Sequence, residues 1–139
     1  FLTAACDLKA ASLIGPPQVV LNLDLDTCTA DDFFFTSAVT MPIERDGTVH
    51  GFGGWFEVDL APKVELSCSP MKVPTHWRQS FFPVRPFPVE RGDTIRFAMN
   101  AQRAEMGDQR LPLYFIDGEV LREGDVVHRF FYRHHGSFE

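Results

Sequence analysis

Apolar and polar residues alternate with a period of two along several short stretches of the chain. This period is typical of β-strands that bury one face and expose the other. It is clear from Leu21 onward in the predicted strand Val19–Asp26 and over Thr94–Gln102, and Val126–Tyr132 is predicted as the last strand. Turn residues separate these stretches, and Asp46-Gly47 and Asp117-Gly118 are dipeptides typical of tight hairpins. The pattern predicts an all-β fold, a β-barrel or sandwich of about ten short, mostly antiparallel strands.

Several stretches depart from plain alternation. Asp7–Ile14 holds good helix formers before a Gly-Pro-Pro sequence, so we expect a short N-terminal helical segment there. Val49–Leu60 predicts a long strand in which glycines mark a bulge, a barrel corner or the close approach of another backbone. Pro83 and Pro86 divide the next apolar residues into short edge strands, because proline cannot donate a ladder hydrogen bond. A further turn is predicted at Gly107-Asp108.

Composition and charge narrow the class of protein. The chain has 139 residues, enough for one domain with its own core, and its net charge is −6. Phosphate contacts need a surplus of cationic side chains, so nucleic acid is not expected as a direct partner. No apolar run approaches the ~18 residues that a membrane span needs, so a membrane is not expected either.

The cysteines indicate a reducing compartment. Cys6, Cys28 and Cys68 are odd in number, and no two of them form a Cys-x-x-Cys pair. A zinc site and a complete disulfide set are therefore both disfavoured, and free thiols suit an intracellular location, the cytoplasm or the nucleus. Cys68 has no obvious activating neighbour in the sequence, so we interpret it as a buried or incidental cysteine rather than a nucleophile.

Candidate chemistry concentrates in the loop Ser67–Gln79. Thr75, His76 and Trp77 follow one another there, and they combine an imidazole that ionises near neutral pH with a flat indole face for a cation. On the residues alone a structural alternative stays open, in which the histidine satisfies a buried carbonyl and the tryptophan plugs a barrel end.

Other polar pairs carry weaker signals. Asp24 and Asp26 are interpreted as a solvated strand face, and Asp31-Asp32 as part of a turn. His134-His135 is interpreted as a surface pair, because no third metal ligand is spaced nearby.

Three motifs, in this order along the chain, resemble the C-terminal β-barrel domain of protein arginine methyltransferases. Val49–Leu60 matches the family's His-Gly-Phe…Trp-Phe-Asp-Val strand, and Leu66–Pro70 matches its Ser-Thr-Ser-Pro loop start. Pro74–Gln79 matches its Thr-His-Trp-Lys-Gln loop. The resemblance extends over Gly15–Tyr132. The chain departs from the pattern by three mild changes, which are Glu57 for Asp, Cys68 for Thr and Arg78 for Lys.

The resemblance implies a division of the chain and roles for three residues. Residues 18–139 would form the barrel, and residues 1–17 would be the remnant of an arm or linker. Thr75, His76 and Trp77 would line the pocket for the substrate arginine. His76 would also be an accessory catalytic residue, bonded to an acidic group of the methyltransferase domain. The implied partners are that domain, arginine-containing protein substrates and a second subunit in a homodimer or heterodimer.

The chain lacks the residues that complete such an enzyme. It has neither a glycine-rich strand-to-helix turn for S-adenosylmethionine nor a paired-glutamate loop to orient the guanidinium. We therefore expect no cofactor or metal site in this chain and no catalysis by it alone, with S-adenosylmethionine bound elsewhere in the parent protein. Two alternatives stay open, a non-catalytic regulatory partner of an active methyltransferase and a β-barrel interaction module.

Overall fold

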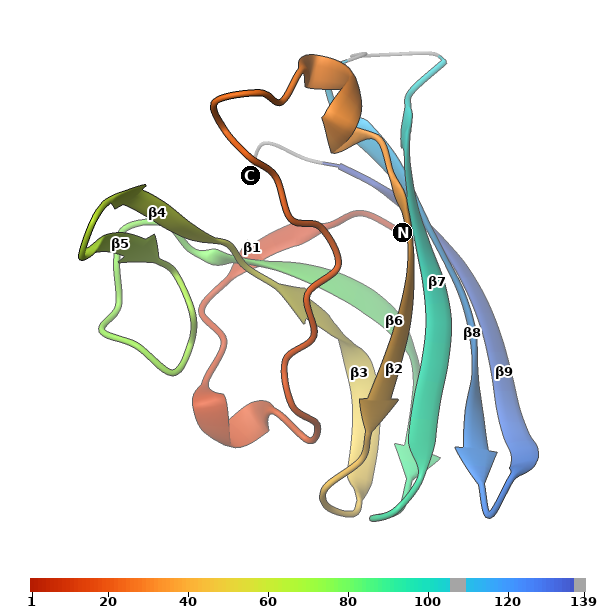
Figure 1. Cartoon of the computed structure of the whole chain (residues 1–139). Coiled ribbons are helices and arrows are strands. Elements are labelled where there is room, and N and C mark those ends of the chain that lie inside the picture. The colour runs from red at the N-terminus through yellow and green to blue at the C-terminus, as the bar shows by residue number, and fades with distance from the viewer. Residues whose placement is uncertain (106–109, 137–139) are drawn as a thin grey trace.

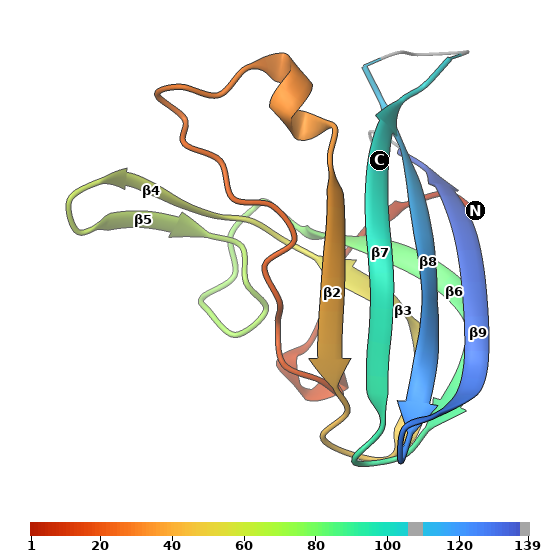
Figure 2. The same cartoon turned by 45° about the vertical axis from the view of Figure 1, so that its right-hand side comes forward.

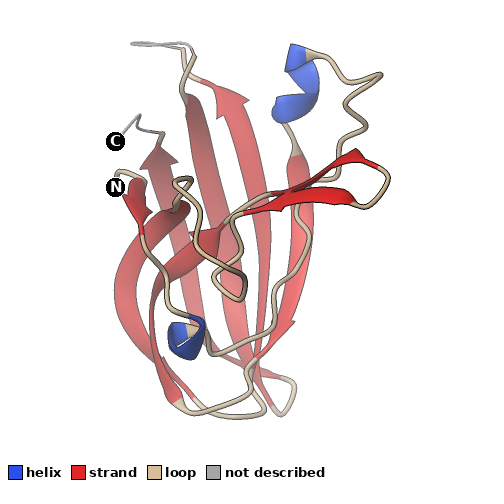
Figure 3. Ribbon diagram, turned by 90° about the vertical axis from the view of Figure 1, so that its left-hand side faces the viewer, coloured by secondary structure: helices blue, strands red, loops and turns tan. Residues whose placement is uncertain are grey.

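A computed structural model describes residues 1–105 and 110–136 of the chain. Strands dominate these residues, and two short 3₁₀ helices, η1 (Ala10–Ser12) and η2 (Ala30–Phe33), complete the regular structure (Figure 3). The turn predicted at Gly107-Asp108 lies outside the described residues. The strands are β1 (Ala4–Cys6), β2 (Thr36–Pro42), β3 (Gly47–Gly54), β4 (Glu57–Ala61), β5 (Val64–Ser67), β6 (Gln79–Val89), β7 (Thr94–Arg103), β8 (Pro112–Arg122) and β9 (Asp125–His135).

The strands form two larger antiparallel sheets and a separate hairpin. One sheet has the order β2-β7-β8-β9, the other has the order β1-β6-β3, and β4 pairs with β5. Figures 1 and 2 show the two larger sheets curving around a shared interior, while the β4–β5 hairpin projects from one side. The predicted all-β barrel or sandwich of mostly antiparallel strands is confirmed.

The core fills the space between the two larger sheets. Ile95, Phe97 and Met99 are buried on one face of β7, as the alternation of that stretch predicts. Removal of these apolar side chains from water, together with those of the opposite sheet, stabilises the closed arrangement. The other members of the core are Val39, Ile43, Val49, Phe82, Val84, Phe87, Val89, Ile116, Val120 and Phe130.

Two glycines allow neighbouring strands to approach closely. A Cβ on Gly118 in β8 would lie 2.5 Å from the Cβ of Phe97 in β7. A Cβ on Gly51 in β3 would lie 2.5 Å from the carbonyl oxygen of Phe82, at a bulge where the register shifts after Val49. The bulge and the close backbone approach predicted for this strand are confirmed, since a larger residue does not fit there.

The hairpin predicted at Asp117-Gly118 is wrong. Both residues lie inside β8 and are paired with β7 and β9. The chain turns instead at Glu123 and Gly124, whose φ angles are 52° and 83°. Asp-Gly is the stronger turn signal in sequence, but Gly118 serves the close strand contact described above. Asp46-Gly47 does lie where the chain reverses, yet β2 and β3 on either side belong to different sheets.

The strand predicted over Val19–Asp26 does not form. At its end the backbone makes local hydrogen bonds instead, from the N–H groups of Thr27 and Cys28 to the carbonyl of Asp24. Val19 and Leu25 are 80% and 61% exposed. The period suits a strand, but a strand also needs a neighbouring ladder, and among the described residues none pairs with this segment.

Three other predicted elements change their bounds. The helical turns expected over Asp7–Ile14 shorten to η1, and β1 precedes them. Val49–Leu60 divides into β3 and β4. Pro83 and Pro86 do not break β6, because its ladder to β3 continues past them. On its other side, β6 pairs with β1 only up to Phe81. The two prolines follow Phe81, so a missing N–H on that side removes no hydrogen bond from the sheet.

A buried carboxylate fastens one end of the barrel. Asp93, in the turn between β6 and β7, is 1% exposed. It accepts hydrogen bonds at 2.9 Å from both Nε and Nη2 of Arg122 at the end of β8, and one at 2.8 Å from the N–H of Glu90. The Arg122 guanidinium, helped by the Glu90 N–H, holds the pKa of the Asp93 carboxyl below its usual range.

Candidate functional site

The candidate site is built on the loop between β5 and β6, and the chain is buried where the loop leaves the end of β5. Ser67, Cys68 and Ser69 are 9%, 2% and 3% exposed. The N–H of Cys68 donates to the carbonyl of Phe56 at 3.2 Å, and its thiol lies 3.6 Å from the same oxygen. Oγ of Ser69 accepts from the N–H of Met71 at 3.2 Å and turns the chain. Cys68 is therefore a buried cysteine, as predicted.

The loop brings Thr75, His76 and Trp77 into one cluster. The rings of His76 and Trp77 are in contact, with centroids 3.9 Å apart, and are tilted by 33°. Oγ1 of Thr75 donates to the carbonyl of Trp77 at 3.1 Å, which tightens the backbone around the histidine. Phe56, just before β4, approaches the Trp77 ring edge-on at 6.3 Å between centroids. Two aromatic neighbours thus orient the indole.

This cluster lies at the surface rather than inside the barrel. Trp77 is 43% exposed, Phe56 is 40% exposed, and His76 is exposed as well. The alternative in which these residues plug a barrel end and satisfy a buried carbonyl is therefore wrong. An exposed indole face beside an imidazole can contact a flat cation and a hydrogen-bonding group at the same time.

Gln79 closes the neck of the loop, which is the place where its first residue, Cys68, and its last residues meet. The sequence alone does not reveal this role. Nε2 of Gln79 donates to the carbonyl of Cys68 at 2.7 Å, and its Oε1 accepts from the N–H of Leu8 at 2.9 Å. Next to it, Nε of Arg78 lies 3.1 Å from Oδ1 of Asp7. A pattern along the chain does not reveal these contacts, because Leu8 and Gln79 are 71 positions apart.

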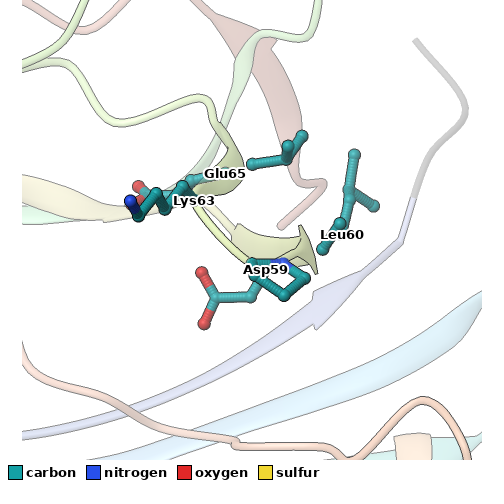
Figure 4. A pocket seen from close by; sticks show the side chains of 7 residues that line it. Asp59, Leu60, Lys63 and Glu65 are labelled. Carbon is teal, nitrogen blue, oxygen red and sulfur yellow. The ribbon is translucent and has the colours of Figure 1, made fainter.

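The β4–β5 hairpin precedes the loop and forms ion pairs with it. Lys72 of the loop pairs with Glu65, and its Nζ lies 3.7 Å from Oε1 of Glu57. At the hairpin turn there is a hollow of about 480 Å³, where Figure 4 shows Asp59 and Leu60 pointing in different directions. The hollow is lined by the hairpin itself and not by His76 or Trp77, so it is separate from the candidate site.

The surface pair predicted at His134-His135 is wrong for His134. Its side chain is 0% exposed, and Nε2 donates to the carbonyl of Pro83 at 2.7 Å, since a carbonyl oxygen can only accept. Burial lowers the pKa of His134, so the ring is neutral at pH 7. Consecutive residues of a strand face opposite sides, which places His134 inward and leaves His135 exposed.

The remaining polar candidates serve local structure. Asp24 lies before a turn rather than on a strand face, and its carboxylate accepts from the N–H of Asp26 at 3.0 Å. Oδ2 of Asp32 accepts from the N–H of Thr29 at 2.8 Å and caps η2. In residues 1–105 and 110–136, the three cysteines are free and no group of three His, Cys, Asp or Glu side chains could hold a metal ion. Across the same ranges, no helix has the length and apolarity to cross a bilayer.

Comparison with known proteins decides where this barrel belongs. A family model described as the arginine methyltransferase oligomerization subdomain matches residues 3–115. The chain belongs to the arginine methyltransferase family. Within that family it corresponds to the C-terminal β-barrel, as the motifs in Val49–Leu60 and Pro74–Gln79 predict.

Individual arginine methyltransferases are similar to the chain over about two thirds of its length. It is 32% identical over 104 residues to protein arginine N-methyltransferase 2 of Homo sapiens. The match covers 69% of this chain and 24% of the human protein. The chain is 31% identical over 111 residues to protein arginine N-methyltransferase PRMT10 of Arabidopsis thaliana, covering 71% of the chain and 29% of that protein. The chain thus spans less than a third of the length of these relatives.

Two solved structures of arginine methyltransferases share the fold. The open conformation of Arabidopsis thaliana protein arginine methyltransferase 10 has a TM-score of 0.87 at 23% identity, covering 96% of this chain and 42% of that one. A chain of the Trypanosoma brucei PRMT1 enzyme-prozyme heterotetrameric complex with AdoHcy has a TM-score of 0.85 at 17% identity, covering 97% and 44%. Both support the barrel architecture.

Proposed function

We propose that this barrel forms one wall of the substrate-arginine channel of a protein arginine N-methyltransferase. The observation that carries the proposal is the exposed pair of rings of His76 and Trp77, which are in contact in a loop of a chain that belongs to this family. In this proposal the indole face of Trp77 lies beside the flat guanidinium of the substrate, since aromatic faces attract cations. His76 bonds to an acidic group of the methyltransferase domain and so fixes the orientation of that domain's catalytic groups.

The described residues do not fit S-adenosylmethionine. The helices there, η1 and η2, are one short turn each, and neither follows a glycine-rich strand end that could receive a cofactor. In the proposed enzyme the cofactor is bound outside residues 1–139 and supplies the methyl group. The residues of this chain bind and orient the guanidinium, which lowers the entropic cost of bringing the reactants together.

We also infer that the parent protein works as an oligomer, a homodimer or a heterodimer, in the cytoplasm or the nucleus. The family model is named for oligomerization, which supports the first part. The free cysteines support an intracellular location. The net charge of −6 favours encounter with cationic, arginine-rich protein segments, because opposite charges raise association rates.

The test uses the full-length protein that contains this chain, incubated with S-adenosylmethionine labelled in its methyl group and an Arg-Gly-rich peptide. We expect the label to enter the peptide, and we expect no label in a matched peptide with Lys in place of Arg. The 139-residue chain alone should transfer none. A full-length protein that binds the cofactor but labels no arginine peptide would contradict the proposal. Stimulation of a companion methyltransferase in that case would favour the regulatory alternative.

A further inference from the structure

One side-chain amide holds both ends of the loop that carries His76 and Trp77. Gln79 is the first residue of β6 and lies opposite Cys6 of β1. Its Nε2 reaches back to the carbonyl of Cys68, where the loop begins, and its Oε1 receives the N–H of Leu8, just after β1. We propose that Gln79 is a positioning residue, which sets where His76 and Trp77 stand against the rest of the barrel. This inference rests on the proposed function.

The other polar contacts of the loop are weaker constraints. The Arg78–Asp7 pair has side chains that are 49% and 70% exposed, and the Lys72–Glu65 pair has side chains that are 47% and 45% exposed. Exposed ion pairs contribute little, because water and salt screen them. The two hydrogen bonds of Gln79 are partly buried and involve no charged group, so they are not screened in this way.

The N–H of Leu8 is itself held in place. A Cβ on Gly53 would lie 2.2 Å from Cδ1 of Leu8, so the leucine side chain sits directly on the bare backbone of β3. This packing fixes the position of the Leu8 backbone, and pairing of β1 with β6 fixes the residues before it. The amide of Gln79 therefore joins the loop to a rigid support rather than to a free segment.

The geometry also explains why this amide controls the site. Trp77 lies two residues before Gln79 and His76 three residues before it, so a shift at the neck moves both rings. The middle of the loop, residues 71–74, is exposed and offers little packing to resist such a shift. A loop whose ends are fixed loses less entropy when its tip is ordered, so closing the neck pre-organises the pair for a substrate.

The test is Gln79→Glu in the full-length protein. The variant keeps the size of the side chain and one oxygen for Leu8, but it places a second oxygen against the carbonyl of Cys68. We expect the KM for the arginine peptide to rise about tenfold, from the loss of one hydrogen bond and the new repulsion. The KM for S-adenosylmethionine should not change. Gln18→Glu, an exposed glutamine in the segment before η2, is the matched control and should leave both constants unchanged.

Amide hydrogen exchange separates this inference from the proposed function. In Gln79→Glu, the hydrogen-bonded amides of Cys68, Met71 and Lys72 should exchange at least about tenfold faster, while those of β7 and β8 keep their rates. If the wild type transfers no methyl group but the exchange changes as expected, the proposed function fails and the positioning role stands. Unchanged exchange in the loop, or an equal change throughout the barrel, would overturn the positioning role.

Discussion

The His76→Ala variant of the full-length protein is expected to lose about 100-fold in kcat/KM for an arginine peptide. The substitution removes both the ring that contacts Trp77, with centroids 3.9 Å apart, and the group proposed to bond to the methyltransferase domain. A displacement of the reacting group by about 1 Å is enough for a loss of this size. Steady-state kinetics with peptide and S-adenosylmethionine varied in turn give the two constants.

A matched control variant shows whether the loss of any exposed histidine has the same effect. His50, in β3, is also exposed, and His50→Ala should keep wild-type kinetics. Thermal unfolding of both variants should match that of the wild type, because each side chain lies at the surface. Wild-type kcat/KM in His76→Ala would remove this residue from the proposed site, whatever the identity of the enzyme.

The Asp93→Asn variant is expected to lose about 2 kcal/mol of unfolding free energy at pH 7. The carboxylate accepts three hydrogen bonds in the folded chain, two of them from the Arg122 guanidinium. The amide cannot accept all three, and its NH₂ group faces the cation. This loss of free energy is kept moderate because the Arg122 side chain is 36% exposed, so water partly screens its charge. Urea unfolding of the 139-residue chain measures the difference.

The pH dependence of this difference has a definite sign. The pKa of Asp93 is lower in the folded chain than the usual value of about 3.9 in unfolded chains. The stabilisation is therefore fully present above that pH and is lost as the pH falls through the lower, folded-state pKa. Wild type and Asp93→Asn should thus approach each other in acid. Asp117→Asn, at an exposed position in β8, should stay within about 0.5 kcal/mol of wild type at any pH.

The strand pattern predicted the class of fold because alternation depends on burial, and burial follows the same period in β7 as in the sequence. It failed where pairing depends on distant partners. Leu21–Asp26 alternates without a break, yet no ladder reaches it among the described residues. Asp117-Gly118 looks like a turn, but the glycine is there for contact with Phe97 across the sheet. Neither outcome is encoded in neighbouring residues.

The candidate site divides in the same way. Thr75, His76 and Trp77 are consecutive, so the sequence could place them in one loop, and the motif could suggest what they contact. Phe56 reaches the cluster through the fold, and Gln79 reaches Leu8 in the same way, so no spacing along the chain reveals either contact. The sequence predicts a surface pair at His134-His135 because no third metal ligand is spaced nearby, whereas the pleat of β9 turns the His134 ring inward.

The central claim is that the substrate arginine lies against the Thr75–Trp77 loop. A photo-crosslinking amino acid at position 56 tests it directly, because Phe56 is 40% exposed and its ring centroid lies 6.3 Å from that of Trp77. The matched probe replaces Phe131, which is 61% exposed on β9. On irradiation of the full-length protein with an Arg-Gly-rich peptide, we expect an adduct from position 56 that unlabelled peptide competes away, and none from position 131. An adduct from position 131 without one from position 56 would contradict the account.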